Sequence, residues 1–185
     1  SATAFLPGPL QTAYKSLFKK AMKKNIFISF DPNYRQLLWK TNIESFIDQS
    51  WNFIQQCHFF KVRDEEAVLI NGSSSVSDAA KFLSEKTKAT FAITLGKAGT
   101  LLMHQKNKII VESIPIQPID TTGAGDAFVG AVLYQLSKYS LQMIQALSTD
   151  DWKNIIHKAN KAGARTCEYM GAMEAFKHLS NQIFD

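Results

Sequence analysis

Short apolar runs alternate along the chain with segments whose apolar residues recur at helical spacing. Apolar runs rich in β-branched and aromatic residues predict buried strands at residues 26–30, 59–62 and 91–95. Helical spacing predicts helices over residues 11–24, 43–54, 64–71, 77–86, 141–147, 151–168 and 173–182. Residues 101–103 and 109–111 predict a hairpin with a polar turn near residues 105–107.

This order of elements favours an α/β fold with a mainly parallel sheet and helices on both faces. The sequence contains no internal repeat and no low-complexity tract, and no composition shift marks a boundary. We therefore expect residues 1–185 to form a single domain.

Charge and composition argue against a membrane protein and against a nucleic-acid-binding protein. No apolar run approaches the length of a membrane span, so we expect no membrane partner. Much of the net charge of +5 comes from lysines on the outer face of the first helix. Its inner face would carry Tyr14, Leu17, Phe18, Ala21 and Met22. Because these lysines are not interleaved with exposed aromatic residues, we expect no nucleic-acid partner. The two isolated cysteines are typical of a reducing compartment, and we expect a cytoplasmic protein.

The segment DTTGAGDAFVGAVL, residues 120–133, carries the clearest chemical pattern. Glycines at the start of a helix leave backbone N–H groups pointing forward, and together with the helix dipole these groups form an anion site. A carboxylate in that place, Asp126, repels an anion, but it can act as a base beside one. The alternative is an ordinary helix start in which Asp126 is a capping residue.

The same fourteen residues resemble the second signature of the ribokinase-like (phosphofructokinase B) family of sugar and nucleoside kinases. The resemblance implies phosphorylation of a sugar hydroxyl by ATP. It also implies that Asp126 is the catalytic base, and that Gly123, Ala124 and Gly125 form the anion hole for the charge that develops during transfer.

The first predicted strand ends in FDPNYRQLLW, which resembles the D-x-N-x-R segment of the family and looks most like its fructokinase branch. The resemblance implies that Arg35 reaches the transferring phosphoryl group or the sugar, while Asp31 and Asn33 organise the loop on the substrate side. The alternative is an Asp-Pro-Asn turn followed by a surface arginine.

The second strand ends in KVRDEEAVLI, where family members usually show N-x-x-E. The resemblance places Glu66 at the glutamate that helps to hold Mg²⁺, often through water, and places Arg63 at the asparagine. A cation beside a magnesium site weakens metal retention unless its side chain points away or meets a phosphate. The alternative is a solvated first helical turn of acidic residues.

The third strand ends in ITLGKAGTLL, which resembles the T-L-G-x-x-G element that contacts nucleotide phosphates in the family, here through Thr94, Gly96 and Gly99. A simple tight turn is the alternative. Asn160 resembles a residue that flanks the adenine, and Asp120 resembles part of a monovalent-cation (K⁺) loop that the turn at residues 170–172 completes. The alternatives are an ordinary helix residue and a glycine turn after a helix.

Family members are longer than this chain, with an N-terminal part that binds sugar through G-G-x-x-N and a small β lid, and no segment here resembles either. We therefore expect a ribokinase-like, fructokinase-like sugar kinase, present as its C-terminal, ATP-side portion, with ATP and Mg²⁺ as cofactors and a small sugar as substrate. The resemblance is compatible with a homodimer of a full-length parent. A non-catalytic, nucleotide-binding or structural remnant of the family is the alternative, and a nucleoside kinase of the family is a third hypothesis.

Overall fold

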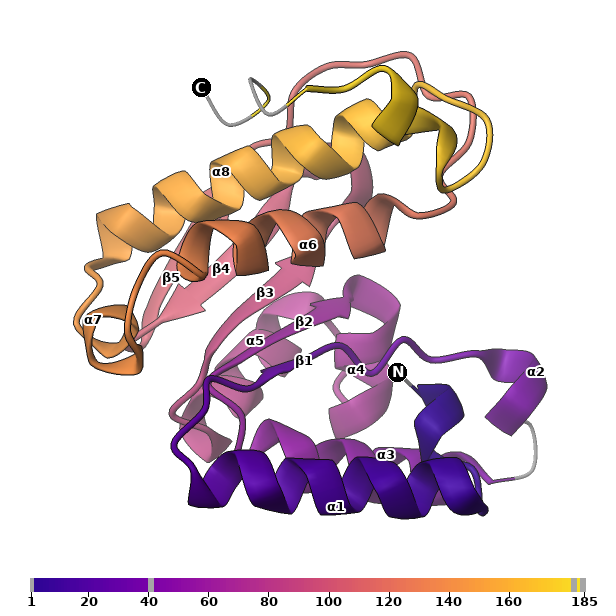
Figure 1. Cartoon of the computed structure of the whole chain (residues 1–185), viewed down its shortest axis with the longest axis vertical. Helices are drawn as coiled ribbons and strands as arrows, with labels where there is room; N and C mark the ends of the chain where they lie inside the picture. The colour runs from indigo at the N-terminus through magenta and orange to yellow at the C-terminus, as the bar shows by residue number, and fades with distance from the viewer. Residues whose placement is uncertain (1, 40–41, 181–182, 184–185) are drawn as a thin grey trace. The chain divides into compact units, whose positions relative to one another are not determined.

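Helices and strands alternate over most of the chain in the computed structural model, which describes residues 2–39, 42–180 and 183 (Figure 1). The strands are β1 (Ser29–Phe30), β2 (Phe59–Arg63), β3 (Thr90–Thr94), β4 (Thr100–His104) and β5 (Asn107–Val111). The helices are α1 (Pro9–Lys23), α2 (Gln36–Trp39), α3 (Ile43–Ile54), α4 (Asp64–Asn71), α5 (Val76–Lys86), α6 (Ala124–Leu136), α7 (Leu141–Gln145) and α8 (Thr149–Thr166). Short 3₁₀ turns are η1 (Ala2–Phe5), η2 (Gly96–Ala98) and η3 (Glu174–Lys177).

The strands hydrogen-bond in the order β1-β2-β3-β4-β5. Strand β1 is parallel to β2, with Ser29 opposite Phe59 and Phe30 opposite Phe60. Strands β4 and β5 follow one another through only two residues, Gln105 and Lys106, whose φ angles are 47° and 69°. A connection this short joins antiparallel strands, so the sheet is mixed. The predicted strands and hairpin are confirmed, although β1 is shorter than expected.

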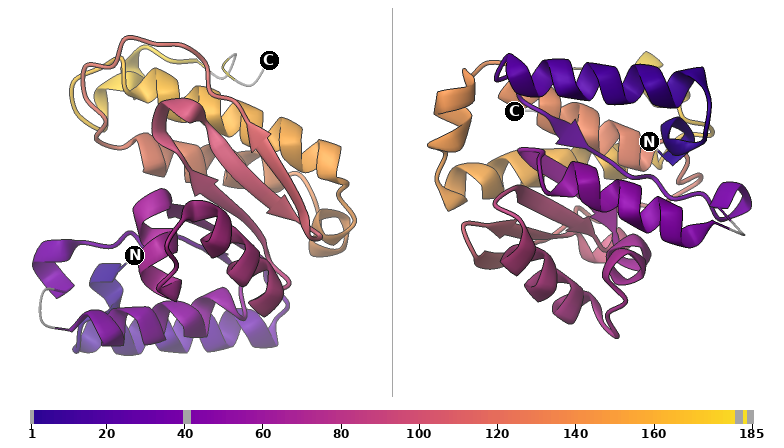
Figure 2. Two further views of the ribbon diagram at one scale, coloured as in Figure 1. Left: turned by 180° about the vertical axis from the view of Figure 1, so that it is seen from behind. Right: turned by 90° about the horizontal axis from the view of Figure 1, so that it is seen from below.

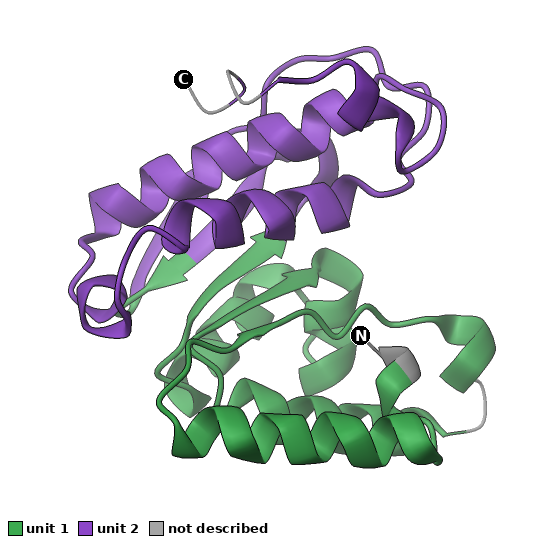
Figure 3. Cartoon of the chain, in the orientation of Figure 1, with its two compact units in different colours: residues 1–93, 103–106 green, residues 94–102, 107–185 purple. Residues whose placement is uncertain are grey.

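The chain divides into two compact units, shown in different colours in Figure 3. One comprises residues 1–93 and 103–106, and the other comprises residues 94–102 and 107–185. Within the described residues, no helix is both long and apolar enough to cross a membrane.

Aromatic side chains fill the core of the first unit. The ring of Phe53, on α3, lies 5.0 Å from that of Phe30 and 4.3 Å from that of Phe18, measured between centroids. The second of these contacts joins α1 to α3, and the two helices lie side by side in Figures 1 and 2. Helix α1 nevertheless has no buried residue, and Leu17 is 65% exposed. The predicted inward position is therefore wrong for Leu17, and also for Met22, which is 38% exposed.

Helices α6 and α8 lie against one another in the second unit (Figure 1). Gly163, on α8, makes this close approach possible, because a Cβ atom there would lie 3.0 Å from the carbonyl oxygen of Ala124. Buried apolar residues of the two helices, among them Phe128, Val132 and Trp152, form the core of this unit.

The helix expected over residues 173–182 is wrong for the part that the structure describes. Only the four-residue turn η3 forms there, and residues 181 and 182 lie outside the described residues. The two largest exposed apolar residues of the predicted helix are Met173 at 70% and Phe176 at 63%, and Ala175 is the buried one. A short helix without a buried apolar face has little tertiary support in water. The short helix α2 was not predicted.

Candidate active site

The DTTGAGD loop leads directly into α6. Gly123 is the N-cap residue and adopts a left-handed conformation, with φ 84°. A Cβ atom there would lie 2.8 Å from the Cβ of Ala172. Both the backbone angle and the close packing require glycine at this position, so the loop is shaped by its contact with the turn at residues 171–172.

The N-terminus of α6 has no side-chain cap. Asp126 is the third residue of the helix and is exposed, and no hydrogen bond or ion pair to its carboxylate is recorded among the described residues. The N–H of Ala124 donates to the carbonyl of Thr121 at 3.2 Å, which leaves the N–H groups of Gly125 and Asp126 as the forward-pointing donors of the first turn. The capping alternative for Asp126 finds no support in this geometry. The arrangement suits an anion beside a free carboxylate.

Asp120 joins the loop to the turn that follows α8. One of its carboxylate oxygens accepts from the N–H of Thr122 at 2.9 Å, and the other accepts from the N–H of Gly171 at 2.8 Å. The hydrogen bonds from Thr122, followed by the one from Gly171, lower the pKa of Asp120. The structure therefore brings together the two segments that the resemblance joins in a cation loop. The role of Asp120 toward a cation stays a prediction.

The turn after β3 also depends on glycine. Gly96 and Gly99 have φ angles of 57° and 94°, and the N–H of Leu95 donates to the carbonyl of Gly99 at 2.8 Å. A Cβ atom on Gly99 would overlap the carbonyl oxygen of Val111 and would lie 2.7 Å from the nitrogen of Ser113. This turn therefore packs directly on the backbone that leaves β5. Thr94, the first residue of the predicted T-L-G-x-x-G element, is the last residue of β3.

Asn160, on α8, holds the same stretch of backbone from the other side. Its side-chain amide donates to the carbonyls of Val111 at 2.8 Å and Glu112 at 3.2 Å. Its oxygen accepts from the hydroxyl of Thr100 at 2.6 Å. The side chain is buried, and both of its amide hydrogens are in use. Sequence reasoning missed this network, because its partners are separated by 48 to 60 positions. A nucleotide contact for Asn160 stays a prediction.

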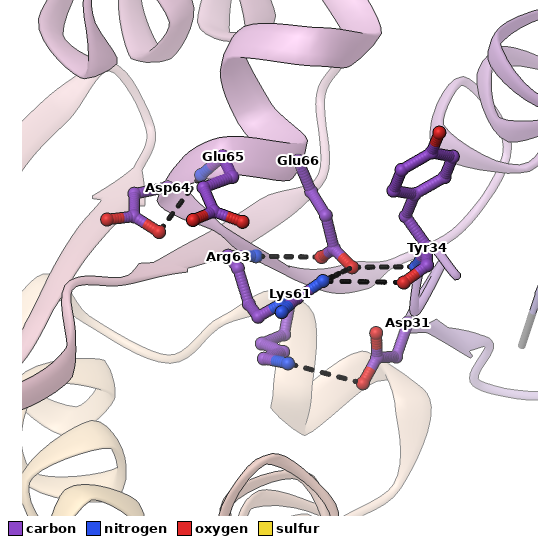
Figure 4. A network of polar contacts seen from close by, with 7 residues as sticks. All are labelled: Asp31, Tyr34, Lys61, Arg63, Asp64, Glu65 and Glu66. Carbon is purple, nitrogen blue, oxygen red and sulfur yellow. Dashed lines mark hydrogen bonds and ion pairs between the residues drawn. The ribbon is translucent and has the colours of Figure 1, made fainter. Parts of the chain in front are cut away.

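Asp31 and Lys61 form an ion pair in the first unit, with 3.4 Å between Lys61 Nζ and Asp31 Oδ2 (Figure 4). Burial raises the pKa of Asp31, and the neighbouring Lys61 opposes that rise. The other carboxylate oxygen of Asp31 is buried and has no hydrogen-bond partner in the described structure. Lys61 was missed from the sequence, although a single lysine inside the apolar strand β2 is a detectable signal.

Glu66 is buried, with 1% of its side chain exposed. Its Oε1 atom accepts from the N–H of Tyr34 at 2.7 Å and from the guanidinium of Arg63 at 3.3 Å. Its Oε2 atom accepts from the N–H of Arg63 at 2.8 Å, which closes the N-terminus of α4. The alternative of a solvated acidic turn therefore fits Asp64 and Glu65, which are exposed, and is wrong for Glu66.

These residues do not fit a magnesium ion held by Glu66. The carboxylate is occupied by three donor groups, one of them cationic, and the side chain does not reach water. Within the described part of the chain, no group of three or more His, Cys, Asp or Glu side chains is placed to hold a metal ion.

The segment that carries Arg35 has a hydrogen-bonded backbone and an exposed Arg35 side chain. Asn33 adopts a left-handed conformation with φ 51°, which asparagine tolerates better than most residues. Tyr34 is held through its N–H by Glu66. The Arg35 side chain is exposed, just before α2. This placement leaves it available to a ligand, and its role toward a phosphoryl group or a sugar stays a prediction.

The chain has the parts expected of a phosphotransferase that acts on a nucleotide. These parts are an α/β fold with a mixed five-stranded sheet, a glycine turn after β3, and an uncapped helix N-terminus beside an exposed aspartate. The sequence profile of the pfkB family carbohydrate kinases matches residues 1–179. The chain therefore belongs to the pfkB family of carbohydrate kinases.

Curated relatives agree with this assignment. The chain is 32% identical over 174 residues to fructokinase-1 of Zea mays, a match that covers 92% of this chain and 52% of that protein. It spans about half the length of the first curated relatives that it matches. A further relative, from Arabidopsis thaliana, is 28% identical over 190 residues and is covered over 88% of its length.

Solved structures confirm the ribokinase-like fold. Aminoimidazole riboside kinase from Salmonella enterica, complexed with aminoimidazole riboside and an ATP analog, superimposes with a TM-score of 0.85 at 26% identity, covering 97% of this chain and 58% of that one. A double mutant of fructokinase from Vibrio cholerae O395, bound to fructose, ADP and a potassium ion, superimposes with a TM-score of 0.82 at 26% identity, covering 94% of this chain and 54% of that one.

Proposed function

We propose that this chain is the ATP-side portion of a fructokinase-like enzyme, which transfers the γ-phosphoryl group of MgATP to a sugar hydroxyl with Asp126 as the general base. The observation that carries the proposal is the start of α6, where an uncapped helix N-terminus lies beside an exposed carboxylate with no recorded hydrogen bond. A helix end of this kind stabilises negative charge, and a free carboxylate can accept a proton.

Each part of the second unit has a role in this proposal. The N–H groups of the first turn of α6 stabilise the charge on the transferring phosphoryl group, and Asp126 accepts the proton of the attacking hydroxyl. The turn from Gly96 to Gly99 offers backbone groups to the nucleotide phosphates. Asp120 and the turn at residues 170–172 form the loop for a monovalent cation. Magnesium enters as the counter-ion of ATP.

In the first unit, Arg35 is the donor to the phosphoryl group or to the sugar, and the segment from Asp31 to Asn33 shapes the substrate side. The bound fructose, ADP and potassium ion of the Vibrio cholerae fructokinase support fructose as the first sugar to test. A cytoplasmic location belongs to the same proposal, as does a homodimer of a longer parent. Both cysteines are free and buried, which fits a reducing compartment.

A second candidate is a nucleotide-binding family member without catalytic activity. The ion pair between Arg63 and the buried Glu66 favours it, since the family's metal-handling glutamate is occupied here. The two candidates differ in turnover and agree in nucleotide binding.

Calorimetric titration of the purified 185-residue chain with ADP, and a coupled assay of ADP release from ATP with and without fructose, test the proposal. We expect ADP binding and no fructose-dependent ADP release by the 185 residues alone, because a kinase must hold both reactants and exclude water. Fructose-dependent release by this chain, lost in Asp126→Asn, would show that it is catalytically sufficient. A chain that binds no adenine nucleotide would refute both candidates.

In an active parent enzyme, Asp126→Asn should lower turnover by about 10²–10⁴-fold, the usual contribution of general base catalysis, and should leave ADP affinity nearly unchanged. Asp150→Asn, another exposed aspartate in the first turn of a helix, is a matched control and should leave turnover unchanged. Near wild-type turnover in Asp126→Asn would end the assignment of the base.

A further inference from the structure

Two of the carboxylates near the ends of β1 and β2, those of Asp31 and Glu66, each pair with a cation (Figure 4). Asp31 pairs with Lys61 at 3.4 Å, and Glu66 pairs with Arg63 at 3.3 Å. The formal charges of the four side chains cancel. Neither carboxylate therefore depends on a bound metal ion for charge balance.

Glu66 also accepts four hydrogen bonds. Its Oε1 atom accepts from the N–H of Tyr34 and from the Nε and Nη2 atoms of Arg63, and its Oε2 atom accepts from the N–H of Arg63. Magnesium requires near-octahedral oxygen ligands and keeps several of its waters. A magnesium ion, or a water of its shell, would have to reach a side chain that is 1% exposed and compete there with these donors.

Arg63 has a second partner, Tyr34, which links the ion pair to the preceding segment. Its Nη2 atom donates to the carbonyl oxygen of Tyr34 at 3.3 Å, while the N–H of Tyr34 donates to Glu66 at 2.7 Å. Both backbone polar groups of Tyr34 are thus held by one ion pair. A planar guanidinium can serve the carboxylate and the carbonyl together, which the single ammonium of a lysine does less well. The next residue is Arg35, the predicted phosphoryl or sugar donor.

We infer that Arg63 is a built-in cation that takes the place of a divalent ion at Glu66. The pair of Arg63 and Glu66 positions the backbone that carries Arg35 and excludes metal from this carboxylate. Glu66 is a positioning residue in this chain. This inference concerns whether the segment that carries Arg35 in the proposed function depends on a metal ion. Its test needs neither nucleotide nor sugar.

The test measures Mn²⁺ binding to the full 185-residue chain without nucleotide. The electron paramagnetic resonance signal of free Mn²⁺ reports how much of the ion remains unbound. The wild-type chain should show no saturable site that depends on Glu66. Arg63→Asn should gain at least about tenfold in Mn²⁺ affinity, because a unit charge within a few ångström of the metal is removed. Arg63→Asn combined with Glu66→Gln should lose that gain.

Arg165→Asn provides a matched control. Arg165 pairs with Glu168 at 2.9 Å with the same spacing of three residues, and the side chains of Arg165 and Arg63 are 43% and 41% exposed. Removing this second arginine frees Glu168, whose side chain is 27% exposed and which follows the end of α8, and it should create no Mn²⁺ site. Equal gains in both arginine variants would show a nonspecific charge effect and would overturn the inference.

Amide hydrogen exchange of Tyr34 gives a second measurement. Its N–H should be protected in the wild-type chain, unchanged by millimolar Mg²⁺, and less protected in Arg63→Asn. Arg63→Lys should restore only part of the protection, because the fork is lost. The inference is overturned if wild-type protection changes with Mg²⁺, if the wild-type chain binds Mn²⁺ through Glu66, or if a folded Arg63→Asn gains no affinity. If Arg63→Asn does not fold, the two wild-type measurements decide.

Discussion

Replacing Gly99 by alanine places a methyl group where the structure has no room for one. The added Cβ would overlap the carbonyl oxygen of Val111 and would lie 2.8 Å from the carbonyl carbon of Glu112. Both obstacles are backbone atoms, and the amide of Asn160 holds those same two carbonyls. The backbone of Gly99, with φ 94° and ψ −132°, is also one that side chains rarely adopt.

The two effects add. A strained backbone costs about 1–3 kcal/mol, and overpacking against atoms that cannot withdraw costs about 1–3 kcal/mol more. We therefore expect Gly99→Ala to lower the free energy of unfolding by about 2–6 kcal/mol, which corresponds to a fall of roughly 5–20 °C in melting temperature for a chain of this size. ADP affinity should fall as well, since the turn offers its backbone to the phosphates in the proposed function.

Gly130→Ala is the matched control. Gly130 lies inside α6, and an added Cβ there meets nothing within 4 Å. This substitution should stabilise the chain by about 0.5–1 kcal/mol, because alanine is the better helix former. Thermal unfolding followed by circular dichroism compares the two variants. If Gly99→Ala melts at the wild-type temperature or above it, the close packing of this turn on the backbone after β5 is refuted.

Two further predictions concern single side chains. Asn160→Ala should destabilise the chain by about 1–3 kcal/mol, because it leaves the buried hydroxyl of Thr100 and the carbonyl of Val111 without their partner; wild-type stability by chemical denaturation would contradict this network. Burial lowers the pKa of His58, whose Nδ1 accepts from the N–H of Ile28 at 3.0 Å. Its contribution to stability should therefore be complete above its unfolded pKa of about 6.5 and should be lost as the pH falls toward the lowered value, which a proton NMR titration measures directly. A folded-state pKa at or above the unfolded value would contradict the predicted sign.

The sequence alone determined most of the local elements and the family. Helix α4 was predicted to run from Asp64 to Gly72, and Gly72 adopts the left-handed conformation that ends it. The glycine turn after β3 and the helix after the DTTGAGD loop were also predicted, since both depend on residues that are neighbours in the chain. Such features are encoded by periodicity, caps and glycine, which act over a few residues.

Only the tertiary structure decided which partner each polar side chain meets. The sequence left Glu66 between a solvated helix turn and a metal ligand, and the structure shows it buried against Tyr34, which is 32 positions away. The same holds for Leu17, which is exposed although its helical position suggested burial. Helical spacing tells which residues share a face, but it does not tell what covers that face. Burial and ion pairing depend on segments that come together only in the fold, and for that reason they could not be read from neighbouring residues.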